Sequence, residues 1–168
     1  MGRIAIVSGI RTPFIRSWTL FEGLPAQKLG AIAVRELIES AELKPDLVDE
    51  VIMGAVAQPG EAANVARVIS LCAGIPEGKR AYTVSRNCAS GFESVTSAAE
   101  KIAAGIDDIV IAGGTESMSN IPLFYRRDTA KIFFKLARAK RPLEKLSWFL
   151  RLRPRHLLNP VVGLELGL

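Results

Sequence analysis

The sequence has few residues that bind metals or form disulfides: two cysteines, Cys72 and Cys88, and a single histidine, His156. The two cysteines do not have the spacing of zinc ligands. They could form at most one disulfide, which a cytosolic compartment disfavours. We therefore expect no metal site, and the role of each cysteine has to be judged separately.

Long apolar runs are also missing. No stretch approaches the roughly 18 residues that a membrane-spanning helix requires, because charges or glycines interrupt every candidate. The first residues lack the apolar region of a secretory signal peptide. We expect a cytoplasmic protein that does not cross a membrane.

The charge is unevenly distributed along an otherwise ordinary globular composition. The 168 residues are 49% hydrophobic and 23% charged, which is enough for one main core. Residues 126–155 hold eleven Lys or Arg against Asp128 and Glu144, a local net charge of +9. Because the whole chain carries +5, the remainder carries −4. The basic character therefore belongs to one segment.

Strand-like and helix-like patterns alternate through the first two thirds of the chain. Short apolar, β-branched runs predict strands at residues 3–7, 48–55, 81–85 and 109–112. Apolar residues at helical spacing predict helices over residues 26–41, 64–73 and 89–104. This alternation predicts a layered α/β domain with a mainly parallel sheet.

The pattern changes after Gly114. Residues 115–120 are rich in turn formers, and basic helical segments follow, separated by Pro142. We therefore predict an α/β domain over residues 1–115 and a mostly helical region over residues 116–168. The basic region carries two apolar stripes, Ile132, Phe133, Leu136 and Ala139 in the first and Leu143, Leu146, Phe149 and Leu150 in the second.

Cys88 is the main candidate for chemistry. The third predicted strand ends near Ser85 and the next helix begins near Asn87 or Cys88, which places a thiol at a helix N-terminus. The unpaired N–H groups there favour a thiolate and could stabilise an oxyanion. Small neighbours leave room for a bulky group. A buried, inert cysteine remains an open alternative on these residues alone.

Other polar residues and the second cysteine are interpreted as structural. Cys72 lies between Leu71 and Ala73 on a helical face, so we expect it in the core. Asn64 is expected to cap the helix that follows it, and Glu116 to order the turn after Gly114.

Four separate segments resemble the amino-terminal signatures of the thiolase family, in the same order and spacing. They are residues 11–14 (Arg-Thr-Pro-Phe), 64–67 (Asn-Val-Ala-Arg), 87–91 (Asn-Cys-Ala-Ser-Gly) and 113–119 (Gly-Gly-Thr-Glu-Ser-Met-Ser). The resemblance covers the whole chain. It implies a thiolase-like layered α/β fold, with the amino-terminal half and its mainly parallel sheet followed by a partial, mostly helical loop domain.

The resemblance also implies an activity. Cys88 would attack the keto carbon of a 3-ketoacyl-CoA, acetyl-CoA would leave, and free CoA would then take the acyl group from Cys88. Coenzyme A is a substrate in this scheme, and no bound cofactor is implied. The basic segment and residues 147–155 look most similar to the thiolase subunit of the multienzyme fatty acid β-oxidation complex.

The family completes this chemistry with later motifs, Asn-Glu-Ala-Phe, Gly-His-Pro and Cys-x-Gly, which are not in this sequence. His156 stands between Arg155 and Leu157, and we interpret it as a solvated or packed surface residue. We therefore expect an amino-terminal fragment that is inactive alone. Its expected partners are a further copy of itself, a missing carboxy-terminal half or a multienzyme partner subunit.

Alternatives remain at this point. A biosynthetic acetyl-CoA acetyltransferase shares every residue available here, while a ketoacyl synthase fits the Arg-Thr-Pro-Phe and 113–119 segments less well. A non-catalytic acyl-CoA-, membrane- or partner-binding remnant is the alternative of a different class. The basic arm, residues 126–155, could attach the protein peripherally to an anionic membrane or to a partner. It lacks any nucleic-acid recognition motif, so we expect no nucleic acid partner.

Overall fold

The computed structural model describes residues 4–154, 156 and 161–162. The chain forms two compact units, Met1–Ile121 and Pro122–Leu168, and each is described on its own. The predicted functional boundary between residues 115 and 116 stays a prediction.

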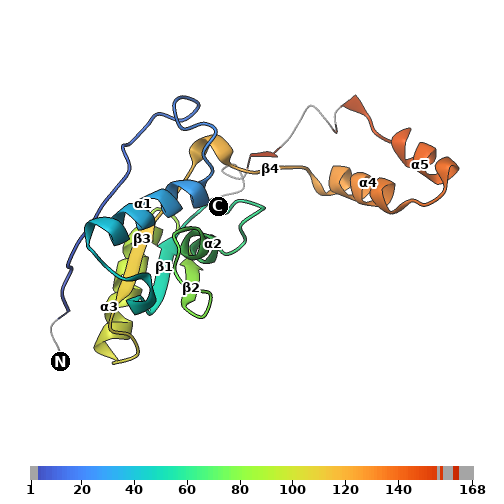
Figure 1. Cartoon of the computed structure of the whole chain (residues 1–168). Helices are drawn as coiled ribbons and strands as arrows, with labels where there is room; N and C mark the ends of the chain where they lie inside the picture. The colour runs from blue at the N-terminus through green and yellow to red at the C-terminus, as the bar shows by residue number, and fades with distance from the viewer. Residues whose placement is uncertain (1–3, 155, 157–160, 163–168) are drawn as a thin grey trace. The chain divides into compact units, whose positions relative to one another are not determined.

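The first unit is built on a three-stranded parallel sheet in the order β2-β1-β3 (Figure 1). Its strands are β1 (Glu50–Gly54), β2 (Arg80–Val84) and β3 (Val110–Gly114). The central strand β1 is buried along its whole length, because it has a strand on each side and helices over both faces. Its run of apolar residues is typical of a strand in that position.

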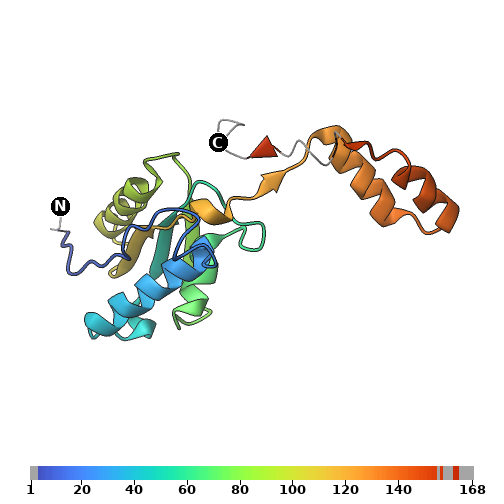
Figure 2. The same cartoon turned by 90° about the horizontal axis from the view of Figure 1, so that it is seen from above.

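Helices cover both faces of this sheet, as the alternating pattern predicts. Helices α1 (Ala26–Ser40) and α2 (Val65–Cys72) lie on one face and α3 (Ser90–Ala103) on the other (Figure 2). The Asn64 side chain accepts a hydrogen bond from the N–H of Arg67 at 3.1 Å, which confirms the predicted cap. These three helices and three strands match the predicted ranges to within two residues at each end.

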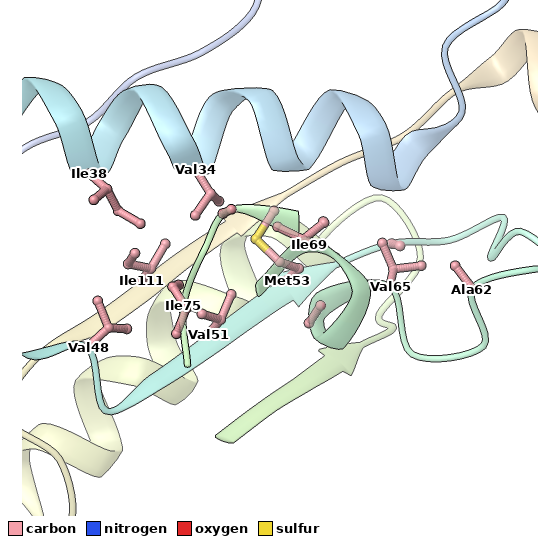
Figure 3. Packing of buried hydrophobic residues seen from close by; sticks show 13 residues of the cluster. Val34, Ile38, Val48, Val51, Met53, Ala62, Val65, Ile69, Ile75 and Ile111 are labelled. Carbon is pink, nitrogen blue, oxygen red and sulfur yellow. The ribbon is translucent and has the colours of Figure 1, made fainter. Parts of the chain in front are cut away.

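The main core lies between α1, α2 and the sheet (Figure 3). Val34 and Ile38 point from α1 toward Val51 and Ile111 on the strands, and Ile69 joins them from α2. Each such side chain contributes about 1.5–3 kcal/mol when it is fully removed from water. This cluster fixes α1 above the sheet, which matters for the site described below.

The predicted strand at residues 3–7 is wrong for the residues that the structure describes. Residues 4–16 form no helix or strand, and Ile6 and Val7 are 86% and 90% exposed. A β-branched run becomes a strand only when another strand pairs with its backbone. None of the described residues pairs with this segment, so the sheet has three strands where the sequence predicted four.

The expected burial of Cys72 is also wrong. Cys72 is the last residue of α2 and is exposed. The buried positions of this helix include Val65 and Ile69, and the next position at that spacing is Ala73, which is buried. Cys72 therefore lies one residue away from the buried stripe.

The second unit is mostly helical, as predicted. Two-residue strands β4 (Leu123–Phe124) and β5 (Val161–Val162) pair antiparallel, and helices α4 (Arg127–Arg138) and α5 (Pro142–Phe149) contact each other. Pro142 begins α5, where the missing N–H of proline costs nothing. Among the described residues, no helix combines the length and apolarity needed to cross a membrane.

The two apolar stripes of the second unit differ in burial. In the first stripe Ile132 and Ala139 are buried, so it packs within the unit. In the second stripe all four side chains are exposed: Leu143, Leu146, Phe149 and Leu150. His156 is 7% exposed, so it is packed and not solvated; its Nδ1 accepts the N–H of Arg153 at 3.0 Å.

Candidate active site

Cys88 lies in the short connection between β2 and α3. Strand β2 ends at Val84 and α3 begins at Ser90, so this connection leaves the carboxyl edge of the parallel sheet. Ligand sites of open α/β sheets lie at that edge. Cys88 is exposed there, and its thiol forms no disulfide.

The turn around Cys88 is held by Ser90. The Ser90 hydroxyl accepts the N–H of Arg86 at 2.8 Å and donates to the carbonyl of Asn87 at 2.7 Å. Asn87 has a positive φ of 49°, a conformation that asparagine tolerates better than most residues. The two bonds of one buried hydroxyl therefore fix the backbone on both sides of Cys88.

Glycines allow the start of α3 to approach the strand ends closely. A side chain at Gly54 would overlap the backbone of Ser90 and Gly91. A Cβ at Gly114 would lie 3.2 Å from the Cα of Gly91. Only residues without a side chain permit this contact. The last residues of β1 and β3 thus position the turn that carries Cys88.

The turn after β3 is tied to the rest of the site by its polar side chains. One oxygen of Glu116 accepts the N–H groups of Val56 and Ala57 at 2.9 and 3.4 Å. The Thr115 hydroxyl donates to the carbonyl of Ala26 at 2.6 Å. Glu116 therefore joins this turn to the loop after β1, in agreement with its predicted scaffold role.

These segments enclose a pocket of about 670 Å³ in the first unit. Cys88 and Asn87 line it together with residues 10–17, the middle of α1, the end of β1 and residues 114–119. Its volume lies within the range of about 300–1,000 Å³ that is typical of small-molecule sites. The nucleophile candidate therefore has a cavity beside it.

Hydrogen-bond donors are available at the start of α3. The N–H groups of Ala89, Ser90 and Glu93 are paired with backbone carbonyls. Within the described part of the chain, no acceptor pairs with the N–H groups of Gly91 and Phe92. Unpaired N–H groups in a first helical turn stabilise nearby negative charge.

Charged side chains lie around the turn. Arg86 pairs with Glu93, and the hydrogen bond to this carboxylate raises the pKa of Arg86 above its usual value. Arg11, Arg16 and Glu116 also line the pocket. His156 belongs to the other unit. No cluster of three or more His, Cys, Asp or Glu side chains in the described ranges could hold a metal ion.

Sequence reasoning placed Cys88 near a helix start, and the structure adds what that reasoning missed. Helix α3 begins at Ser90, two or three residues after the predicted start near Asn87 or Cys88, and Ala89 is at the cap position. The bracing by Ser90 and the wall supplied by α1 were not predicted. The serine two residues after Cys88 was the available signal for the bracing of the turn. Nothing in the local sequence indicates that α1 supplies a wall of the pocket.

The sequence matches the family model described as Thiolase, N-terminal domain, over residues 4–145. The chain belongs to the thiolase family. It is 42% identical, over 93% of its length, to proteins named 3-ketoacyl-CoA thiolase from Yersinia enterocolitica serotype O:8 / biotype 1B and from Yersinia pestis strain Pestoides F. The chain spans 36% of the length of each of these relatives.

Solved thiolase structures share this fold. An acetyl-CoA acetyltransferase from Bacillus anthracis is 34% identical, with a TM-score of 0.62, over 64% of this chain and 27% of that one. The Acat5 thiolase from Ascaris suum, solved in complex with coenzyme A, is 33% identical with a TM-score of 0.68. The match covers 70% of this chain and 31% of the Ascaris chain. The predicted thiolase-like layered α/β fold is therefore confirmed.

Proposed function

We propose that the chain is the Cys88-bearing part of an acyl-CoA thiolase, which transfers acyl groups between coenzyme A and the Cys88 thiol. The observation that carries this proposal is the position of Cys88: exposed, on a braced turn at the carboxyl edge of the sheet, and beside a pocket in a chain of the thiolase family. The reaction class is acyl transfer through a thioester on the enzyme.

In the degradative direction, the Cys88 thiolate attacks the keto carbon of a 3-ketoacyl-CoA. The bond between the α carbon and the keto carbon breaks, acetyl-CoA leaves with a proton on its α carbon, and the shortened acyl group stays on Cys88. The thiol of a second CoA then attacks the thioester, and a proton returns to Cys88. The substrates are thus 3-ketoacyl-CoA and CoA, and the products are acetyl-CoA and the shortened acyl-CoA, with no bound cofactor.

The 42% identity to proteins named 3-ketoacyl-CoA thiolase favours this degradative reaction. The alternative is a biosynthetic acetyl-CoA acetyltransferase, the activity named for the Bacillus anthracis structure of 34% identity. In both reactions Cys88 carries the acyl group. No histidine and no second cysteine lines the pocket among the described residues, so we propose that turnover needs groups from a carboxy-terminal half or a partner subunit.

Protection from alkylation tests whether the pocket binds these substrates. The chain is treated with iodoacetamide with and without acetyl-CoA or CoA, and the labelling of each cysteine is followed by peptide mass spectrometry. We expect saturable protection of Cys88, while labelling of Cys72, which does not line the pocket, is unchanged. Equal protection of both cysteines, or of neither, would contradict the proposed substrate site.

We also propose that the basic arm attaches the protein peripherally to an anionic membrane. Helix α5 exposes Leu143, Leu146 and Phe149, and Leu150 directly after it is exposed too. Arg141, Lys145 and Arg151 lie within two residues of these side chains in the sequence. Apolar side chains flanked by cations are typical of helices that bind in the plane of an anionic surface. Each Lys or Arg near such a surface contributes about 1 kcal/mol before screening by salt.

Sedimentation with vesicles tests this attachment. The chain should bind vesicles with phosphatidylserine at low salt, bind neutral phosphatidylcholine vesicles weakly, and lose binding as salt is raised. A variant with Lys135, Arg138, Lys140 and Arg141 replaced by Gln should lose most of the binding. Unchanged binding by that variant would contradict membrane attachment by the arm and leave an acidic partner subunit as the alternative.

Self-association is a further proposal. Helix α3 exposes Phe92 and Val95, and Ile106 in the turn after it is exposed too, so apolar side chains remain in contact with solvent here. Apolar surface of this kind marks a site of protein association. We therefore propose that the protein forms a homo-oligomer, and light scattering across micromolar concentrations tests it. A monomer at every concentration would contradict it.

A further inference from the structure

The pocket beside Cys88 extends under helix α1. Leu29 and Ala33 on α1 line the same cavity as Cys88, and so does Met53, which points from β1 toward α1 (Figure 3). Met53 is 3% exposed, so it closes the cavity on the side of the core. The wall opposite the solvent is thus formed by apolar side chains.

We propose that the acyl chain carried by Cys88 lies in this cavity against α1, and that Leu29 and Ala33 limit the length of chain that fits. The inference rests on the proposed acyl transfer, which it deepens by naming residues that select the substrate. An extended hydrocarbon chain suits an apolar wall, because the free energy of binding becomes more favourable when methylene groups are removed from water. A polar ligand would find no hydrogen-bond partners on such a wall.

The packing of α1 explains why Ala33 is the critical position. One turn earlier, Gly30 packs so closely against the side chains of Ile69 and Thr115 that a Cβ there would require Ile69 to shift. This contact fixes α1 at its distance from the cavity. Ala33 is half-buried on the cavity wall, and a larger side chain at this position would extend into the cavity volume.

The charged side chains that line the pocket come from residues 10–17 and from the turn after β3, and not from α1. One oxygen of Glu116 is held by the N–H groups of Val56 and Ala57, and its other oxygen is buried without a hydrogen-bond partner among the described residues. Arg11 and Arg16 belong to the exposed segment of residues 10–17, and the Arg11 guanidinium lies 5.1 Å from the centre of the Phe14 ring. The apolar wall of α1 and Met53 is therefore available to a hydrocarbon chain.

Alkyl methanethiosulfonates of increasing length test the cavity without any acyl-CoA. The cysteine thiolate attacks the alkylthio sulfur, a disulfide forms, and methanesulfinate leaves. Each methylene that is buried raises the rate by up to about fourfold. We expect the hexyl reagent to modify Cys88 at least about tenfold faster than the methyl reagent, with no such ratio at Cys72, which provides the internal control.

Variants of α1 test which residues form the wall. Ala33→Phe should lower the hexyl-to-methyl rate ratio at Cys88 to the ratio found at Cys72. Leu29→Ala should extend the preference to the decyl reagent. Ile32→Phe is the matched control, because Ile32 is 50% exposed and does not line the cavity; it should behave as the wild type.

The outcomes separate this inference from the proposed function. Equal hexyl-to-methyl ratios at Cys88 and Cys72, or an unchanged ratio in both Ala33→Phe and Leu29→Ala, would overturn the acyl cavity even if acyl-CoA protects Cys88. A chain-length preference that Ala33→Phe removes would establish the cavity even if acyl-CoA gives no protection. An unchanged circular dichroism spectrum and an unchanged thermal unfolding transition show that each variant is folded.

Discussion

At the scale of single residues, the two exposed cysteines have different surroundings. Cys88 lies on a turn held by the Ser90 hydroxyl, just before α3, whose Gly91 and Phe92 N–H groups have no partner among the described residues. Cys72 is the last residue of α2, where carbonyl groups and not N–H groups are exposed; its own carbonyl accepts a hydrogen bond from Arg35 at 2.6 Å. Position in the fold, and not exposure alone, should therefore set their reactivity.

The first prediction is that iodoacetamide alkylates Cys88 faster than Cys72 in the folded chain. Negative charge on sulfur is favoured at a helix N-terminus and disfavoured at a C-terminus. The rates are measured by peptide mass spectrometry at pH 7. In urea the two rates should converge. Equal or reversed rates in the folded chain would contradict the role given to the α3 terminus.

The second prediction concerns Ser90. Replacing Ser90 by Ala removes two hydrogen bonds from the turn that carries Cys88 and should lower the free energy of unfolding by about 1–2 kcal/mol. It should also slow modification of Cys88 by the hexyl reagent. Ser97→Ala, elsewhere on α3, is the matched control and should change neither the free energy nor the rate. Identical behaviour of the two variants would show that Ser90 does not brace the turn.

At the scale of secondary-structure elements, the two ends of the sheet differ. The carboxyl edge carries the pocket, and the amino edge carries a network of ion pairs. Asp107, buried before β3, pairs with Arg80 at the start of β2, and Lys101 of α3 pairs with the buried Glu50 at the start of β1. These pairs join α3, β1, β2 and the segment before β3 at the end of the sheet away from Cys88.

The third prediction is a double-mutant cycle on this network. Arg80→Leu leaves the buried Asp107 carboxylate unpaired and should cost about 2 kcal/mol, below the roughly 3–5 kcal/mol of a fully buried pair because Arg80 is half-exposed. The double variant Arg80→Leu/Asp107→Leu should cost less than the sum of the single variants. Arg86→Leu, at the exposed pair with Glu93, should cost less than Arg80→Leu because water screens that pair. Urea unfolding measures the free energy of unfolding of the two single variants, the double variant and Arg86→Leu. If the losses of the two single variants add up to that of the double variant, Arg80 and Asp107 are not coupled.

The fourth prediction uses Asp49, which precedes β1. Hydrogen bonds from the N–H groups of Ile109 and Asp108, at 3.0 and 2.9 Å, lower the pKa of Asp49 below its ordinary value of 3.8. A carboxylate whose pKa is lower in the folded chain than in the unfolded chain adds stability at any pH above its unfolded pKa. This stability is lost as the pH falls through the folded pKa. Wild-type stability should therefore decline below about pH 4.

Thermal unfolding between pH 6 and pH 3 checks this effect. Asp49→Asn should be less stable than the wild type at pH 6 and should lose less stability on acidification. Asp46→Asn, an exposed residue of the short helix before β1, is the control and should follow the wild type. Parallel pH profiles for the wild type and Asp49→Asn would contradict the contribution of Asp49.

At the scale of the whole molecule, local patterns predicted the elements of the first unit but not all of their contacts. Apolar runs and helical spacing indicated α1 to α3 and β1 to β3, because each element buries a face that its own sequence encodes. The β-branched run at residues 4–7 failed as a strand because pairing depends on a partner distant in sequence. Likewise, nothing near Cys88 indicates that α1 forms the wall of its pocket.

Catalytic activity depends on the whole molecule, because among the described residues the pocket is lined by one cysteine and no histidine. The fifth prediction is that the isolated chain shows no CoA-dependent cleavage of acetoacetyl-CoA, followed by loss of its absorbance. Repeated turnover that survives purification and disappears in Cys88→Ala would show that the chain needs no further groups.

Transfer from an acyl-CoA tests most directly whether Cys88 carries the acyl group. The chain is incubated with octanoyl-CoA, and the adduct is located by intact-mass and peptide mass spectrometry. Attack of the Cys88 thiolate on the thioester carbonyl expels CoA, so we predict one octanoyl group per chain, on Cys88. It should be released by hydroxylamine and absent in Cys88→Ala, while Cys72→Ala retains it. An adduct on Cys72 or on lysines that persists in Cys88→Ala, with Cys88 unmodified, would contradict the account.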